Sequence, residues 1–219
     1  MAWSGTVGSA ATLADSGISV CQDELVDKRV ERGRTTRRQL ISTATDLFSK
    51  VGYDATSIEA VLDASHASRG SLYHHFANKE ALFEAVLEDV EAKVAQRLRD
   101  ASSSASSAKE AIVAGCQAFL RLARDPTVRQ IVLIDAPAVV GWRRWREIDE
   151  RHAFGLLKAG VAAAASESGL SDEMVDPLAH IILASLLESA LLVAGSNRPR
   201  ESVGRAEEAM ALTVSRLFA

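Results

Sequence analysis

Apolar residues recur every three or four positions along most of the chain, which is the spacing of one face of an α-helix. A clear example runs over residues 78–99, where one face carries Leu82, Phe83, Val86, Val90, Val94 and Leu98. No stretch shows the two-residue alternation of a half-buried strand. The pattern therefore predicts an all-α protein of about nine helices.

Residues 56–83 are the most structured part of this pattern, because polar caps and short apolar stripes alternate there. We expect Thr56 to cap one short helix, with Glu59 completing a capping box, and Ser68 to open a second. Asn78 is expected to cap the long helix that follows. Since only Ser65-His66-Ala67 separates the first two helices, the stretch predicts a helix-turn-helix.

The second of these short helices begins with small or polar residues, which let a backbone approach base edges in a DNA groove. Arg69 is a long donor among them, and Lys79 lies in the first turn of the next helix, where a phosphate is favoured. Leu72 and Phe76 are expected to face the core. The candidate DNA-contacting residues are Arg37, Thr56, Ser57, Ser68, Arg69, Gly70, Ser71, Tyr73, His74 and Lys79.

The run S-R-G-S-L-Y-H-H-F-A-N-K-E-A-L-F, residues 68–83, closely resembles the DNA-binding segment of TetR-family transcriptional regulators. The resemblance covers about residues 35–95. It departs at the turn, where that family usually has Ala-Gly-Val and this chain has Ser65-His66-Ala67. Glycine suits a left-handed backbone and histidine tolerates it less well, so the departure predicts altered or strained turn geometry.

The resemblance implies a homodimeric, one-component regulator of a palindromic operator, most simply a repressor released by a small-molecule effector. In such a protein the effector shifts the helix that begins at Asn78, and the last two helices form a four-helix dimer interface. The apolar arcs of these helices are also wider than one packed face requires. The candidate interface residues are Ile181, Leu187, Leu191, Met210 and Val214.

Charge supports a division of the chain into three parts. Residues 1–27 are predicted to be a disordered extension, residues 28–80 the DNA-binding domain, and residues 81–219 the effector-binding and dimerisation domain. The net charge is −4, yet residues 28–80 carry nine Lys or Arg and six Asp or Glu. Six of those bases lie between Lys28 and Arg38. This basic run is either a solvated helix start or an arm that contacts phosphates or the minor groove.

Several helix boundaries follow from the remaining stripes. We expect helices over about Thr36–Val51, ended by Gly52, and over Trp142–Ser166. A further helix capped by Asp176 should reach Ala194, and a last one should cover Pro199–Leu217.

One face of the expected Trp142–Ser166 helix could line an effector pocket. The candidate pocket residues are Phe119, Trp142, Trp145, His152 and Leu156. His152 is equally well explained as a core histidine with a carbonyl or carboxylate partner, and the aromatic residues as core. His180 and Glu188 could be pocket groups or an interface pair.

Other classes of protein have little support. Cys21 and Cys116 are far apart and suggest neither a disulfide framework nor a zinc site, and no nucleophile elbow, metal-spaced histidine pair or phosphate loop is present. We therefore expect no cofactor and no catalysis.

Location follows from hydropathy. The most apolar run, near residues 181–194, is broken by Ser185, Glu188 and Ser189, and no secretory signal is evident, so a cytoplasmic protein without a membrane span is expected. The alternatives are a ligand-independent DNA-binding protein and, with less support, a small-molecule-binding enzyme or carrier.

Overall fold

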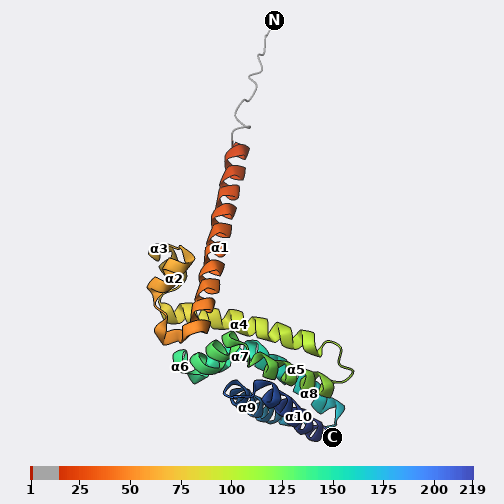
Figure 1. Cartoon of the computed structure of the whole chain (residues 1–219). Helices are drawn as coiled ribbons and strands as arrows, with labels where there is room; N and C mark the ends of the chain where they lie inside the picture. Colours follow the sequence, from red (N-terminus) through yellow and green to blue (C-terminus); the bar gives the residue numbers. More distant parts are fainter. Residues whose placement is uncertain (2–14) are drawn as a thin grey trace. The chain divides into compact units, whose positions relative to one another are not determined.

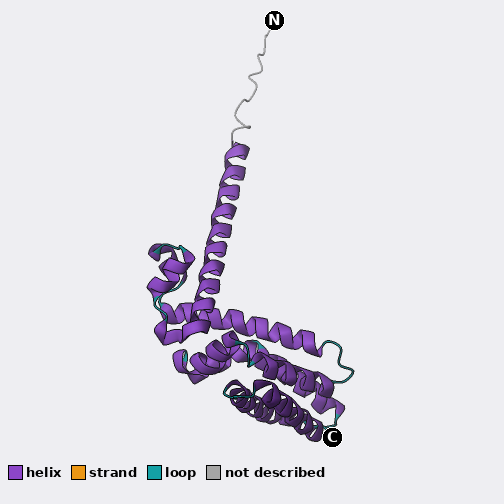
Figure 2. Ribbon diagram, in the orientation of Figure 1, coloured by secondary structure: helices purple, strands orange, loops and turns teal. Residues whose placement is uncertain are grey.

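The computed structural model describes Met1 and residues 15–219, and within them the side chains of Met1, 31–198 and 200–219. Ten α-helices, one π-helical segment and one short 3-10 helix account for nearly all of this part of the chain, and it contains no strand (Figures 1 and 2). The predicted all-α class is confirmed. The chain divides into two units, residues 1–39 and 40–219.

Helix α1 (Asp15–Ala55) starts earlier than the predicted Thr36, so residues 15–27 are helical rather than irregular. The first part of the predicted extension lies outside the described residues. Near its end α1 is interrupted at Gly52, whose φ of 82° and ψ of 170° are open to glycine and strained for other residues. The predicted break at Gly52 is confirmed, and Val51 just before it is exposed.

Three helices follow α1: α2 (Ile58–Ser65), α3 (Arg69–His75) and α4 (Lys79–Ser102). They pack with the end of α1 because each presents apolar residues at helical spacing to a common centre. Leu72 and Phe76 face that centre as predicted. The other fully buried side chains of this small core include Leu40, Ala44, Phe48, Val61, Leu82 and Phe83.

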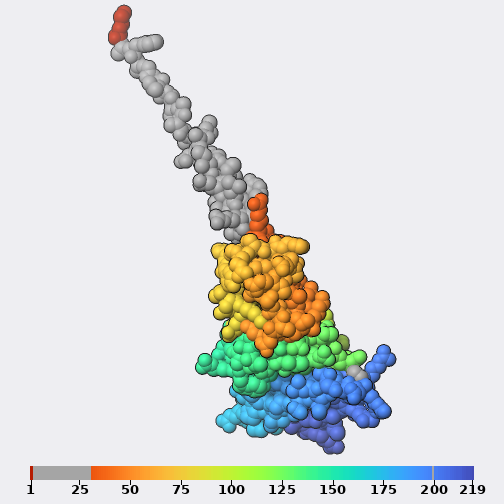
Figure 3. Space-filling model, turned by 60° about the vertical axis from the view of Figure 1, so that its left-hand side comes forward, coloured from red at the N-terminus to blue at the C-terminus, as the bar shows by residue number. Residues whose placement is uncertain are grey.

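The rest of the chain forms helical layers against α4. They comprise α5 (Ala108–Leu122), the π-helical η1 (Val128–Asp135), α6 (Ala136–Val139), α7 (Gly141–Arg151), α8 (Ala153–Glu167), the 3-10 helix η2 (Asp172–Met174), α9 (Val175–Ala194) and α10 (Pro199–Leu217). Helix α4 packs mainly on α5, while α9 and α10 pack on each other, on α5 and, for α9, on α8. Within residues 40–219, the middle of the sequence, coloured green in Figure 3, lies between α2 and α3 on one side and α9 and α10 on the other.

Two predicted boundaries in the second half of the chain are also wrong. The expected helix from Trp142 to Ser166 is broken at His152, whose φ of −124° and ψ of −103° are not helical. The expected cap Asp176 lies one residue inside α9, and its carboxylate pairs with Lys158 of α8 at 2.8 Å instead. His152 contacts Glu88 of α4 and Asp176 pairs with Lys158, so both side chains have their partners on another helix.

Among the described residues, one segment, Asp172–Ala194, is long and apolar enough to cross a bilayer by length and composition. This segment is longer than residues 181–194, on which the expectation of no membrane span was based. Helix α9 nevertheless packs on three neighbouring helices, and its buried residues include Leu178, Ile182 and Leu186. Its hydropathy therefore has a structural explanation within a helical bundle.

Candidate nucleic-acid interface and effector cavity

Helices α2, α3 and α4 of the helix-turn-helix region each begin with a side-chain cap. In each case the capping side chain accepts a hydrogen bond from the backbone amide three residues later. Ser57 Oγ accepts a hydrogen bond from Ala60 N at 3.0 Å, Ser68 Oγ from Ser71 N at 3.1 Å, and Asn78 Oδ1 from Ala81 N at 2.7 Å. Each contact satisfies an amide that the helix itself leaves open. The caps at Ser68 and Asn78 are confirmed.

The expected cap at Thr56 is wrong, because the helix starts one residue later. Thr56 is 2% exposed and its hydroxyl donates to the Gly52 carbonyl at 2.8 Å. Its side chain therefore braces the end of α1 and is not part of the exposed surface. Glu59 forms no capping box, since it is paired with Arg69.

The turn between α2 and α3 has the backbone that the sequence comparison suggested. His66 ends α2 with φ 55° and ψ 21°, the only non-glycine residue with positive φ in the described part of the chain. The left-handed conformation costs an L-residue roughly 1–2 kcal/mol. The strain predicted from histidine at this position is therefore confirmed in the backbone angles.

The first turn of α3 is exposed. Ser68, Arg69 and Gly70 are on the surface, Ser71 is half-buried, and Tyr73 and His74 are exposed farther along. A Cβ added to Gly70 would meet nothing within 4 Å. Nothing inside the fold therefore requires glycine here, and its small size leaves room for an external surface to come close.

Two basic residues of this surface have partners inside the protein. Arg69 Nη2 donates to Glu59 Oε1 of α2 at 2.7 Å, and this hydrogen bond lowers the pKa of Glu59. Lys79 Nζ lies 4.0 Å from the centre of the Tyr53 ring. Both groups stay exposed enough to exchange these contacts for phosphate or base contacts. Arg37 is exposed within residues 1–39.

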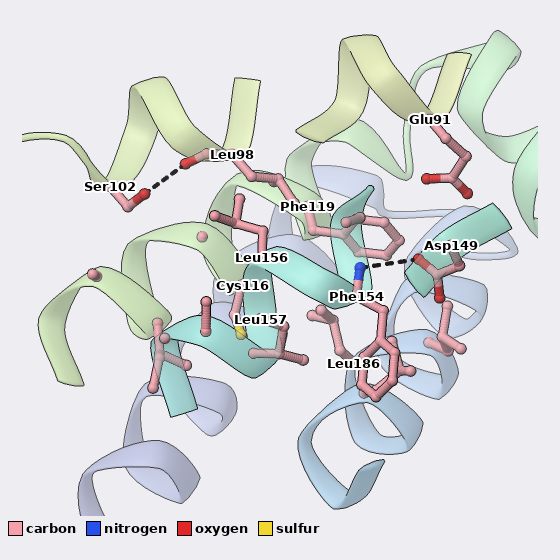
Figure 4. A pocket seen from close by; sticks show the side chains of 18 of the residues that line it. Glu91, Leu98, Ser102, Cys116, Phe119, Asp149, Phe154, Leu156, Leu157 and Leu186 are labelled. Carbon is pink, nitrogen blue, oxygen red and sulfur yellow. Dashed lines mark hydrogen bonds between the residues drawn. The ribbon is translucent and has the colours of Figure 1, made fainter. Parts of the chain in front are cut away.

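A partly open, mostly apolar cavity of about 140 Å³ lies among α4, α5, η1, α7, α8 and α9 (Figure 4). Most of its wall is aliphatic or aromatic. The lining residues are Glu91, Leu98, Ser102, Ala111, Ile112, Gly115, Cys116, Phe119, Val132, Trp145, Asp149, Ala153, Phe154, Leu156, Leu157, Ala159, Gly160, Leu183, Leu186 and Leu187. A cavity of this kind is suited to a small, largely apolar ligand.

Three of the five predicted pocket residues line this cavity, namely Phe119, Trp145 and Leu156. The other two lie elsewhere. Trp142 is 61% exposed, and His152 Nε2 contacts Glu88 Oε2 at 2.6 Å outside the cavity wall. The carboxylate-bound alternative considered for His152 describes its actual position, because the break between α7 and α8 turns it toward α4.

Sequence reasoning missed the two acids at one end of the cavity, Glu91 of α4 and Asp149 of α7 (Figure 4). Burial raises the pKa of Asp149, although the charge of Arg146 opposes this. Burial also raises the pKa of Glu91 well above its ordinary value, and the negative charge of Asp149 adds to the effect. The sequence held one signal for Glu91: it follows Leu87 by four positions and therefore lies on the apolar face of α4, where Leu87 is fully buried.

The predicted interface residues divide into two groups. Ile181 and Leu191 are exposed and Leu187 is half-buried, whereas Met210 and Val214 are buried within the chain. The last two have almost no surface to offer a partner, so their assignment to an interface does not fit this structure. The exposed apolar side chains of this region also include Leu192 and Leu212.

His180 and Glu188 do not line the cavity. Both are exposed on α9, and His180 Nδ1 contacts the Asp176 carbonyl oxygen at 2.9 Å. Of their two proposed roles, only the interface role fits this position.

Comparison with known proteins matches both parts of the chain. A family model described as "Bacterial regulatory proteins, tetR family" matches residues 40–86, and one described as "Tetracyclin repressor-like, C-terminal domain" matches residues 109–217. The transcriptional regulator UidR of Escherichia coli K12 is 30% identical over 76 residues, which are 35% of this chain and 39% of UidR. The chain therefore matches only about two fifths of the length of that relative.

Two further similarities cover more of the molecule. The transposon Tn10 TetC protein of Escherichia coli is 24% identical over 156 residues, 69% of this chain and 77% of TetC. The crystal structure of a TetR-family transcriptional regulator from Pectobacterium atrosepticum has 29% identity and a TM-score of 0.69, covering 84% of this chain and 94% of that one. With the helix-turn-helix and the helical C-terminal region both matched, the chain belongs to the TetR family of transcriptional regulators.

Proposed function

We propose that the protein is a homodimeric transcriptional repressor that binds a palindromic operator and releases it when a small molecule occupies the cavity. The observation that carries this proposal is the exposed first turn of α3, where Arg69 and Gly70 are presented by a capped helix over a turn of fixed geometry. A short recognition helix makes few base contacts by itself, so two copies reading two half-sites are needed for useful specificity.

Dimerisation is supported by the apolar face of α9 and α10. Ile181, Leu191, Leu192 and Leu212 are each between 45% and 67% exposed. A patch of this kind on a soluble protein marks an interaction surface. Leu192→Glu is therefore expected to give a monomer by light scattering, whereas a dimer of unchanged mass would move the interface to other helices.

Release requires a physical connection between the cavity and the DNA-binding helices. Helix α4 provides one, because Glu91 and Leu98 line the cavity while the same helix begins at Lys79. The segment η1 provides a second, because Val132 lines the cavity and Asp135 accepts a hydrogen bond from Tyr53 N at 2.8 Å. A ligand that displaces either element changes the position of α2 and α3.

The proposal places the protein in the cytoplasm with chromosomal DNA and assigns it no catalytic step. The test is selection of genomic DNA by the purified protein, followed by binding to the selected site at several salt concentrations. We expect a palindromic site and a steep loss of affinity with salt, because each neutralised phosphate releases counterions. Weak binding without sequence preference would contradict the proposal.

A ligand-independent DNA-binding protein is the second candidate, and the cavity distinguishes the two. An apolar space of about 140 Å³ inside a helical bundle lowers stability, so a protein that only binds DNA gains nothing from keeping it. Thermal stabilisation by cavity-sized ligands, together with loss of operator binding, is expected of the repressor alone.

A further inference from the structure

The polar groups of the cavity are few and unevenly satisfied. Asp149 has two partners, since its Oδ1 accepts from Phe154 N at 3.2 Å and its Oδ2 from Arg146 Nη1 at 3.0 Å. Ser102 donates to the Leu98 carbonyl at 2.9 Å. Glu91 is 1% exposed, and its Oε2 accepts no hydrogen bond from any described residue. Buried polar atoms normally have partners, so Glu91 is the group that a ligand would complete.

The charges around Glu91 determine which ligand this is. Arg146 already pairs with Asp149, and Glu88 is paired with Arg151 and His152. The charge of Arg146 favours the ionised form of Glu91, but its guanidinium is hydrogen-bonded to Asp149, and no described Lys or Arg forms an ion pair with Glu91 itself. Burial and the negative charges of Asp149 and Glu88 raise the pKa of Glu91, so the protonated form is favoured when no cation lies beside it. An anionic ligand would add to the negative charge, whereas a cation would take the place of that proton.

Volume restricts the rest of the ligand. An apolar cavity of about 150 Å³ accommodates benzene, and this one has about 140 Å³ with Phe119, Phe154 and Leu186 in its wall. The body of the ligand is therefore about one ring in size and apolar.

We propose that the effector is a small amphiphilic amine, whose apolar body fills the cavity and whose protonated nitrogen donates to Glu91 Oε2. This inference rests on the proposed function, because it names the ligand class of the same cavity. On binding, the amine keeps its proton and Glu91 loses its own to the solvent, so one proton is released for each amine bound. Trp145 Nε1, also buried without an acceptor, adds a donor for a hydroxyl or carbonyl on larger members of the class.

The test compares three ring-sized probes by calorimetry on the full-length protein. Benzylamine is cationic at neutral pH, ethylbenzene is its uncharged isostere, and benzoate is an anion of similar size. We expect benzylamine to bind about tenfold or more tightly than the other two, with proton release seen as a dependence of the heat on the ionisation enthalpy of the buffer. Equal affinity for benzylamine and ethylbenzene, stronger binding of benzoate, or no binding of any probe would overturn the proposal.

Two variants assign the effect to Glu91. Glu91→Gln keeps the shape of the side chain and should remove the tenfold preference for benzylamine while ethylbenzene still binds, which also shows that the cavity is intact. Asp89→Asn is the control, because Asp89 is on the same helix and pairs with Lys93 at 2.6 Å without lining the cavity. It should leave all three affinities unchanged. A benzylamine affinity that survives Glu91→Gln would overturn the proposal.

The proposed function can fail separately. If benzylamine binds through Glu91 but operator binding is unaffected at saturating probe, the ligand class stands and effector-controlled release is wrong. If the protein binds its operator and none of the probes, the ligand class is wrong and the DNA-binding function stands.

Discussion

The helix-turn-helix and the α7–α8 region end their helices in different ways. In the first, Ser57, Ser68 and Asn78 each accept a hydrogen bond from an amide three residues later. In the second, α7 ends at His152, with no side-chain cap there. Its geometry depends on Glu88, a residue 64 positions earlier, and on Asp149, which binds Phe154 N. Local contacts specify the first region, whereas the second combines a local contact, from Phe154 N to Asp149, with a tertiary contact between His152 and Glu88.

The largest effect on stability is expected at Gly155, just after the break between α7 and α8, where there is least room for a side chain. A Cβ on Gly155 would lie 2.2 Å from the Glu150 carbonyl oxygen, so Gly155→Ala must displace the backbone. We expect a loss of about 2–4 kcal/mol in the free energy of unfolding, measured by denaturant titration at fixed protein concentration. Gly204→Ala in α10 is the matched control, since a Cβ there meets nothing within 4 Å. Equal stability of the two variants would show that the break is not sterically fixed.

The next effect concerns the cavity and depends on pH. The folded-state pKa of Glu91 is raised, so the native protein holds a proton that the unfolded chain loses as the pH rises above its ordinary pKa. Stability therefore falls from about pH 4.5 upward until the folded-state pKa is passed. Glu91→Gln should be more stable than the wild type by ~1–2 kcal/mol at pH 8 and no more stable at pH 4. A difference that is constant across this range would mean that Glu91 does not titrate as described.

In the helix-turn-helix, a substitution at Gly70 should change protein stability and DNA affinity in opposite directions. Alanine fits the fold at this position and favours a helix, so Gly70→Ala should raise stability by about 0.5–1 kcal/mol. The added methyl group occupies the space that a groove would need, and operator affinity should fall about tenfold in fluorescence anisotropy. A variant that gains stability and keeps full affinity would place the DNA away from the first turn of α3.

The smallest effect is expected at the strained turn. His66→Gly removes a side chain from a left-handed residue, and we expect a gain of about 1 kcal/mol, reduced somewhat by the greater entropy of glycine in the unfolded chain. Thermal unfolding should shift upward by about 2–4 °C. A downward shift would show that His66 makes a stabilising contact that offsets its backbone strain.

The difference between the helix-turn-helix and the α7–α8 region also explains which features could be predicted from the sequence. The fold class, the helix-turn-helix and the caps at Ser68 and Asn78 followed from spacing and side-chain chemistry within a few residues. The Thr56 cap failed by one position because Thr56 and Ser57 are both good caps, and only the break at Gly52 decides between them. That break gives Thr56 a carbonyl partner and buries it.

The effector region was harder to predict. Phe119, Trp145 and Leu156 line the cavity. His152 does not, because the expected continuous helix breaks there. Trp142 lies at the start of α7, where it is exposed and its ring contacts that of Trp145. Met210 and Val214 were assigned to an interface although they are buried within the chain. An apolar stripe indicates that a face is covered, and only the packing shows whether its own chain or a second copy covers it.

The central claim is that α3 reads DNA sequence through Arg69, with Lys79 holding phosphate, and its most direct test measures the ratio of operator to scrambled-site affinity. Arg69→Ala should lower this ratio by about tenfold or more, and Lys79→Ala should weaken both sites alike with a salt slope shallower by about one. Glu59→Gln, which removes the partner that Arg69 contacts at 2.7 Å, should keep the ratio and so exclude an effect of the lost ion pair. An unchanged ratio in Arg69→Ala, or an equal loss of ratio in Lys79→Ala, would contradict the claim.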